Sequence, residues 1–212
     1  NDKVDPYSYQ PQEAIRILRS VGWDDRDADS ILEKDGRKFE FTSYTVEGEV
    51  LSTDVLQIIQ QQLRDIGIKM DIAVLPFDKF VDQTMRKREF DAIILYYPFR
   101  SVFETSHIYW HSDQIEDGLN FSSYKNLKVD HLLDEARLSL DPDRRLAAFK
   151  EFQKELHDDP PGIFLFWRNM PIAFHKRYHG IPEKKMESFR DLIHIWVPRD
   201  EQRGLVDKDE GL

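Results

Sequence analysis

The stretch that decides the fold spans residues 66–97 and reads IGIKMDIAVLPFDKFVDQTMRKREFDAIILYY. Within it, residues 70–75 alternate side chains between two faces, which is typical of a strand. After Pro76, residues 77–88 place Phe and Val side chains at helical spacing. Residues 92–97 form a nearly continuous apolar run, as expected of a strand buried on both faces. The stretch therefore predicts a strand–helix–strand unit.

The preceding residues extend this unit by another strand and helix. Residues 39–45 alternate like a strand, and residues 53–66 carry the most regular helical pattern, with Ser52-Thr53-Asp54 as capping residues and Gly67 as the stop. A strand–helix–strand–helix–strand order predicts parallel strands with right-handed crossovers. We therefore expect an α/β fold with a mainly parallel sheet flanked by helices, whose ligands bind beyond the carboxyl ends of the strands.

Three further helices are predicted at residues 11–21, 127–140 and 142–157, the last opened by Asp141-Pro142 and ended by Pro160-Pro161. Their spacing predicts one buried stripe on each helix. The expected buried residues are Ala14, Ile15, Leu18 and Val21, then Val129, Leu132, Leu133, Ala136 and Leu140, then Leu146, Phe149, Phe152 and Leu156. The apolar residues 163–174 favour a strand, with Pro171 at a sheet edge.

Composition excludes several classes of protein. The chain has 212 residues and a net charge of -10, which argues against nucleic acid as a partner. It has no cysteine, so disulfides, thiolate chemistry and cysteine-ligated metals are excluded. No apolar run approaches the roughly 18 residues of a membrane span. The first residues, 1–10, contain no apolar signal-peptide core and resemble the end of a linker.

Two clusters invite a metal interpretation. The acidic run at residues 24–29 lacks the Gly and Glu that a calcium-binding loop needs at its sixth and twelfth positions, so a solvated turn is favoured. His107 and His111 are four residues apart, as zinc ligands on a helix are, but no Glu lies between them and no third ligand is evident. The sequence therefore nominates no metal site and no cofactor.

No catalytic arrangement is evident either. The chain contains no Ser-His-Asp order, no glycine-rich phosphate loop and no nucleophile elbow. Without a candidate nucleophile, an enzyme is not expected, and a hydrolase on an α/β scaffold is the weakest alternative. A receptor or interaction module that signals without transport remains the other alternative.

Several short motifs follow one another in a characteristic order. They are YQPQEA at residues 9–14, VGW at 21–23, QLRDIGI at 62–68, FDA at 90–92, FSSYKN at 121–126, VDHLLDEA at 129–136, DP at 141–142 and PGI at 161–163. Together, over residues 7–181, they resemble the family 5 extracellular solute-binding proteins, the oligopeptide- and dipeptide-binding type that serves ABC importers.

The resemblance implies a type II periplasmic-binding-protein-like fold, in which two α/β lobes joined by a hinge close on a ligand. This chain would be the second lobe at residues 1–160, followed by a crossover towards an N-terminal lobe at 161–198 and a flexible tail at 199–212. The implied partners are a peptide or peptide-like ligand, the N-terminal lobe and the ABC permease. The implied location is periplasmic or extracellular, lipid-anchored or free.

The segment after the strand at residues 92–97 is the first candidate binding region. In the oligopeptide-binding members that the chain resembles, an aspartate after this strand takes the α-ammonium group of the peptide. Counting without a gap places Arg100 there, and a guanidinium suits a carboxylate or phosphate instead. An anionic ligand, or a sugar-like ligand stacked on an aromatic ring, is then an alternative to a peptide. Arg100 on the surface or in an ion pair is the other interpretation, and a shifted alignment would put Glu104 in the acidic role.

The candidate ligand-binding residues lie near the expected strand ends or on aromatic segments beyond them. They are Tyr96, Tyr97, Arg100, Ser101, Trp110, Tyr124, Thr45 and Glu47. For two of them a structural role is an open alternative. Trp110 suits a stacking wall or the core, and Tyr124 suits a ligand contact or an anchor for its own loop.

Overall fold

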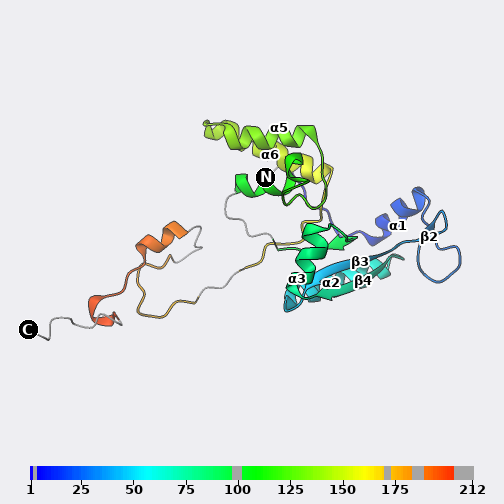
Figure 1. The fold of residues 1–212 in the computed structure, drawn as a ribbon, viewed down its shortest axis with the longest axis horizontal. Coiled ribbons are helices and arrows are strands. Elements are labelled where there is room, and N and C mark those ends of the chain that lie inside the picture. The colour runs from blue at the N-terminus through cyan, green and yellow to red at the C-terminus, as the bar shows by residue number, and fades with distance from the viewer. Residues whose placement is uncertain (2–3, 97–101, 170–172, 183–188, 203–212) are drawn as a thin grey trace, which may run out of the picture. The chain divides into compact units, whose positions relative to one another are not determined.

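The computed structural model describes residues 1, 4–96, 102–169, 173–182 and 189–202. It divides into two units, Asn1–Ile163 and Phe164–Leu212, which are described separately. The first unit holds the named strands and the long helices, drawn from blue to yellow in Figure 1. Among the described residues, no helix is both long and apolar enough to cross a membrane.

A three-stranded parallel sheet forms the centre of the α/β part of the first unit. Strand β3 (Glu40–Val46) lies between β4 (Lys69–Leu75) and β5 (Ala92–Ile93). The register pairs Val46 with Leu75 and Tyr44 with Ile93. The predicted parallel pairing is thus confirmed, but β5 is shorter than expected. Its pairing with β3 stops at Ile93, and the exposed Tyr96 shows that the apolar run is not buried throughout.

Helix α2 (Val50–Arg64) connects β3 to β4 and packs mainly against β4. It buries Leu56 and ends at Arg64, two residues before the predicted end at residue 66, and the turn that follows passes through Gly67, whose positive φ suits glycine. The predicted cap at Ser52-Thr53-Asp54 is wrong because the helix already begins at Val50. The hydroxyl of Thr53 donates to the carbonyl oxygen of Glu49, a bond made within a helix rather than at a cap.

The crossover from β4 to β5 is helical but irregular. Helix α3 (Phe77–Phe80) continues directly into the π-helix η1 (Val81–Arg86). Phe80 and Thr84 are the buried residues of this segment, and the Thr84 hydroxyl donates to the carbonyl oxygen of Phe80. A helix between the two strands is therefore confirmed. Its second part is a π-helix, which the spacing of the side chains did not indicate.

The N-terminal elements lie beside the sheet. Helix α1 (Pro11–Ser20) precedes a hairpin of β1 (Glu33–Lys34) and β2 (Arg37–Lys38). The predicted stripe of α1 is only half-buried, and Val21 is exposed, because α1 lies at the margin of the unit (Figure 1).

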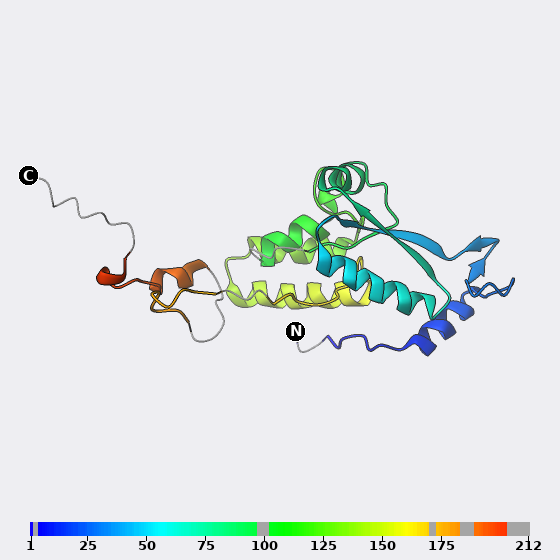
Figure 2. The same ribbon diagram turned by 90° about the horizontal axis from the view of Figure 1, so that it is seen from below.

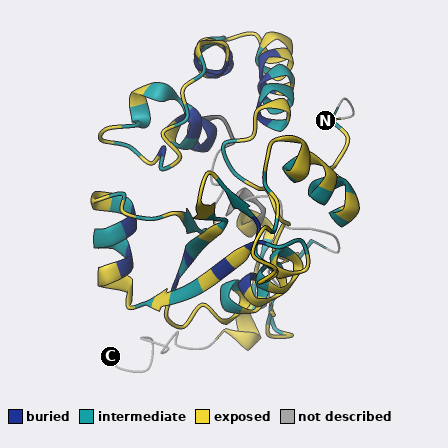
Figure 3. Ribbon diagram, turned by 90° about the vertical axis from the view of Figure 1, so that its right-hand side faces the viewer, coloured by how far each residue is buried: buried dark blue, intermediate teal, exposed yellow. Residues whose placement is uncertain are grey.

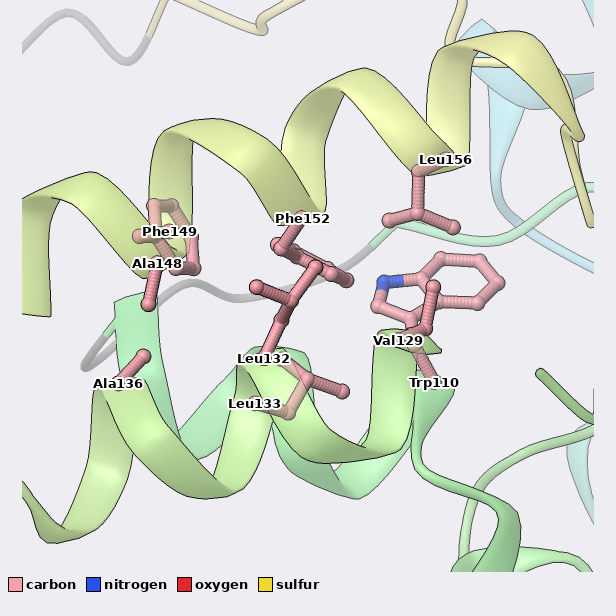
Figure 4. Packing of buried hydrophobic residues seen from close by; sticks show 9 residues of the cluster. All are labelled: Trp110, Val129, Leu132, Leu133, Ala136, Ala148, Phe149, Phe152 and Leu156. Carbon is pink, nitrogen blue, oxygen red and sulfur yellow. The ribbon is translucent and has the colours of Figure 1, made fainter. Parts of the chain in front are cut away.

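The remaining helices of the first unit build a separate core. Helix α4 (Val102–Trp110) leads through the 3-10 helix η2 (Ser112–Gln114) to α5 (Leu127–Leu138) and α6 (Pro142–Asp158). Helices α5 and α6 run along each other (Figure 1), and seen from below α6 is the long yellow-green to yellow helix in front (Figure 2). Asn126 and Asp141 cap them by accepting bonds from backbone N–H groups of the first turn. The buried residues that meet here are Trp110, Val129, Leu132, Leu133, Ala136, Ala148, Phe149, Phe152 and Leu156 (Figure 4).

Two residues of the predicted helical stripes are not in this core. Leu140 is exposed because α5 ends at Leu138, so Leu140 belongs to the turn before α6. Leu146 is 52 % exposed and lies on the outer side of α6. Figure 3 shows the resulting pattern, in which buried positions gather on one side of the helices and in the sheet.

The second unit is mostly irregular. It contains the 3-10 helices η3 (Phe189–His194) and η4 (Arg199–Glu201) and one bridge between His179 and Trp196. The predicted strand over residues 163–174 is wrong in its described part, residues 163–169 and 173–174. No strand pairs with these residues, and Ile163 and Trp167 remain exposed. Residues 203–212 of the predicted tail lie outside the described residues, and the return of this segment to another lobe stays a prediction.

Candidate functional site

The carboxyl ends of the three parallel strands meet at one edge of the sheet. The N–H of Glu47 donates to the carbonyl oxygen of Leu75 at 2.8 Å, so β3 and β4 end side by side. The N–H of Ile94 donates to the carbonyl oxygen of Tyr44 at 3.2 Å and brings β5 to the same edge. Ligands of open α/β sheets bind at such an edge. Two of the predicted site residues, Glu47 and Tyr96, are exposed there.

Three other predicted site residues, Tyr97, Arg100 and Ser101, lie outside the described residues. They belong to the segment that joins the edge of the sheet to helix α4, which begins at Val102. Their roles in ligand binding therefore stay predictions.

Thr45 lies one residue before the end of β3, but its side chain is only 1 % exposed. Ser43, on the same face of the strand, is 3 % exposed. A hydroxyl that the lobe itself covers is not presented to a ligand at the surface. The burial of Thr45 favours a packing role.

Trp110 and Tyr124 both lie against the helical core. Trp110 is buried with Val129 and Leu156 (Figure 4), which favours the core-packing alternative over a stacking wall. The hydroxyl of Tyr124 accepts a hydrogen bond from Nδ2 of Asn126 at 3.1 Å, and burial raises the pKa of this phenol. Tyr124 is thereby held by its own loop, which favours the anchoring alternative.

Asn120 is a structural residue that sequence reasoning missed. It is fully buried, and its Nδ2 donates to the carbonyl oxygens of His111 and Tyr124 at 3.1 and 2.9 Å. Its Oδ1 accepts from the N–H of Tyr124 and the hydroxyl of Ser122. The only signal in the sequence is its position directly before the FSSYKN motif. One amide side chain thus fixes the loop between η2 and α5.

Arg88 connects this loop to the crossover helix. Its Nη1 donates to the carbonyl oxygen of Asn120 at 2.7 Å, and its Nη2 donates to that of Gly118 at 3.2 Å. The guanidinium also lies over the ring of Phe121, with 5.9 Å to the centroid. The loop is therefore positioned from two sides.

The acidic run does not offer a vacant cation site. Asp25, Asp27 and Asp29 come together, but the ammonium of Lys38 bonds Asp29 and lies 3.1 Å from Oδ2 of Asp27. These hydrogen bonds raise the pKa of Lys38 and keep it charged. The ammonium of Lys38 already supplies the positive charge that a metal ion would bring to these carboxylates.

The second unit has a shallow depression of about 460 Å³. It is lined mainly by apolar and aromatic side chains, among them Phe174, Tyr178 and Trp196. All of its lining residues belong to the second unit, and none is a predicted site residue.

The match to known proteins agrees with this arrangement. Residues 1–118 match the family described as bacterial extracellular solute-binding proteins, family 5 Middle. The chain belongs to family 5. The predicted family is thereby confirmed, and family 5 proteins are extracellular binders of solutes rather than a class of enzymes.

The similar protein AppA is considerably longer than this chain. The oligopeptide-binding protein AppA of Bacillus subtilis is 31% identical over 193 residues, which are 91% of this chain and 35% of AppA. The solved structure of AppA with a nonapeptide matches with a TM-score of 0.73 and 28% identity, over 93% of this chain and 39% of that one. The chain thus spans little more than a third of AppA.

Two other solved structures show the range of ligands among similar proteins. NikZ from Campylobacter jejuni, in complex with Ni(L-His), matches with a TM-score of 0.68 and 26% identity over 76% of this chain and 33% of NikZ. A periplasmic oligopeptide-binding protein from Thermotoga maritima with bound mannohexaose matches with a TM-score of 0.67 and 25% identity over 76% of this chain and 31% of that protein. These structures confirm the type II periplasmic-binding-protein-like fold class of the lobe.

Proposed function

We propose that this chain is one lobe of the substrate-binding component of an ABC importer and that it captures a peptide or peptide-like solute against a second lobe. The observation that carries the proposal is the match to AppA over nearly the whole chain, in a structure solved with a nonapeptide. The α/β unit supplies the edge of a parallel sheet where such a ligand would lie, with Glu47 and Tyr96 exposed at it.

The mechanism is domain closure. A ligand that touches both lobes binds the closed form better than the open form and shifts the population towards it by that difference in affinity. The protein acts as a binder and delivers its ligand to a permease from the periplasm or the extracellular side. Neither step requires a nucleophile.

The first experiment measures peptide binding by isothermal titration calorimetry, with the complete two-lobe protein and with this chain alone. We expect the complete protein to bind a nonapeptide and the chain alone to bind it at least about tenfold more weakly, because closure around the ligand is lost. Native mass spectrometry of the complete protein should find retained peptides. Equal affinities would contradict closure, and the absence of any peptide binding by the complete protein would contradict the proposed ligand.

A second candidate ligand is an anionic or sugar-like solute. Two observations favour it: Arg100 stands where the resemblance places an acidic residue, and a similar protein from Thermotoga maritima was solved with mannohexaose. A guanidinium can donate two parallel hydrogen bonds to a carboxylate or phosphate. The aromatic ring of the exposed Tyr96 offers a face on which a sugar can stack.

Substituting Arg100 separates the two candidates. In the complete protein, Arg100→Ala should weaken an anionic ligand by about 1.5–3 kcal/mol, the value of a hydrogen bond to a charged group. The exposed Arg86, on η1, provides the matched control, and Arg86→Ala should leave the affinity unchanged. An affinity that survives Arg100→Ala would remove this residue from the site.

A further inference from the structure

Two histidines and an aspartate from different helices face one another in the helical part of the first unit. His107 lies on the last turn of α4 and His111 directly follows that helix, and the N–H of His111 donates to the carbonyl oxygen of His107 at 3.0 Å. Their rings stack with 4.4 Å between centroids. Asp134 comes from α5, with Oδ1 at 3.8 Å from Nε2 of His107 and Oδ2 at 3.7 Å from Nε2 of His111.

The ring nitrogens that point towards Asp134 have no hydrogen-bond partner. Nε2 of His107 and Nε2 of His111 are both buried and unbonded, and His107 as a whole is only 6 % exposed. Leaving a buried polar atom unbonded is costly, so native structures pair nearly all of them. A histidine that served only to fill the core would bond this nitrogen. Nε2 of His107 also lies 3.8 Å from Oδ2 of Asp113, so the two unbonded nitrogens face carboxylates that would attract a cation.

Asp113 engages the other nitrogen of the His111 ring. Nδ1 of His111 accepts a hydrogen bond from the backbone N–H of Asp113 at 3.1 Å and lies 2.7 Å from Oδ1 of the same residue. Nε2 is therefore the nitrogen left for a metal ion, and zinc would bind the tautomer whose proton is on Nδ1, where Oδ1 of Asp113 could accept it.

We propose that His107, His111 and Asp134 bind a zinc ion, which ties α4 to α5. Two imidazole nitrogens and one carboxylate oxygen are three protein ligands of the kind that zinc takes, with a water molecule at the fourth position. The distances of 3.7 and 3.8 Å join the two histidines to different oxygens of Asp134, and the two rings are stacked with 19° between their planes. Zinc binding therefore requires the rings to turn until both Nε2 atoms face one ion beside a single carboxylate oxygen. The half-exposed side chain of Asp134 can move with them, and it gives the ion a route from solvent.

The ion would fix the helix that follows the candidate binding edge. Helix α4 begins at Val102, a few residues along the chain from Tyr96. Trp110, at the end of α4, packs in the core with Val129 of α5. A zinc bridge would add a further connection between the two helices. This role is independent of which solute the complete protein captures.

The test is zinc binding by the 212-residue chain, freed of metal with a chelator and carrying no polyhistidine tag. Isothermal titration calorimetry should show saturable binding of one Zn²⁺ per chain, and zinc should raise the thermal midpoint. Asp134→Asn should weaken zinc binding by at least about 10–100-fold, because it removes a ligand. Mutating even a residue that only hydrogen-bonds a ligand lowers metal affinity by that factor. His107→Gln should do the same.

Two controls make the result decisive. His131 lies on α5 but is exposed and outside the cluster, so His131→Gln should leave zinc binding unchanged. Magnesium should not compete, because it prefers oxygen ligands. Asp134→Asn replaces the carboxylate of a side chain that is 46 % exposed by an amide of the same shape, so this variant should fold even if the buried His107→Gln does not. The proposal is overturned if the chain does not bind zinc, or if Asp134→Asn binds it as tightly as the unchanged chain does.

Discussion

Replacing Phe152 by alanine should lower the free energy of unfolding of the chain by about 3–5 kcal/mol, the usual loss for a buried phenylalanine. Phe152 is 2 % exposed and points from α6 into the core that α4 and α5 share (Figure 4). Its ring lies 5.2 Å from that of Phe149, so the substitution also removes an aromatic contact. The surrounding helices cannot move to fill the resulting cavity without losing other packing contacts.

Urea unfolding followed by circular dichroism measures this loss. Leu146→Ala is the matched control, because Leu146 lies on the same helix and is 52 % exposed. Its substitution should cost less than about 1 kcal/mol, since little apolar surface returns to water. Equal losses for the two variants would mean that α6 presents a different side to the core.

Local patterns predicted the elements that local forces determine. Alternation over residues 70–75 and the apolar stripe of α2 each require only neighbouring residues, and their order along the chain implied the parallel pairing of β3 with β4 and β5. Asp141-Pro142 likewise marks the start of α6, because the cap is made within the helix's own first turn.

The wrong predictions concern features that depend on contacts between distant parts of the chain. Helical spacing placed Leu146 on the stripe of α6, but which residues are covered depends on how α5 lies against that helix. The apolar residues from Ile163 onward suited a strand by composition. A strand also needs a partner, and none pairs with the described part of this segment. Helix α2 begins at Val50, directly after the turn at Gly48, and not at the predicted residue 53. The capping side chains of Ser52-Thr53-Asp54 do not indicate this earlier start.

The candidate site shows the same limit. The sequence indicated that strand ends would carry exposed residues, and Glu47 and Tyr96 lie there. It did not indicate that Thr45 is covered by the lobe itself. The pairing of His107 and His111 was visible as a spacing, but Asp134 comes from another helix, and only the packing of α4 on α5 brings it to them.

Asn120→Ala should destabilise the chain by about 2–4 kcal/mol, because it leaves buried polar groups of the loop without partners, each at about 1–3 kcal/mol. The N–H and the carbonyl oxygen of Tyr124 both lose their bonds to this amide. The carbonyl oxygen of His111 loses one bond but keeps the N–H of Gln114 at 3.1 Å. The loss should therefore come mainly from the Tyr124 side of the loop.

Urea unfolding measures the loss, and limited proteolysis between η2 and α5 reports whether the loop has opened. Ser122→Ala is the matched control, because Ser122 is exposed and its hydroxyl makes one bond to Oδ1 of Asn120. It should cost less than about 1 kcal/mol, since water can replace that bond. If Asn120→Ala cost no more than the control, the loop would owe its position to Arg88. This residue follows η1, bonds the carbonyl oxygens of Gly118 and Asn120, and is untouched by either substitution.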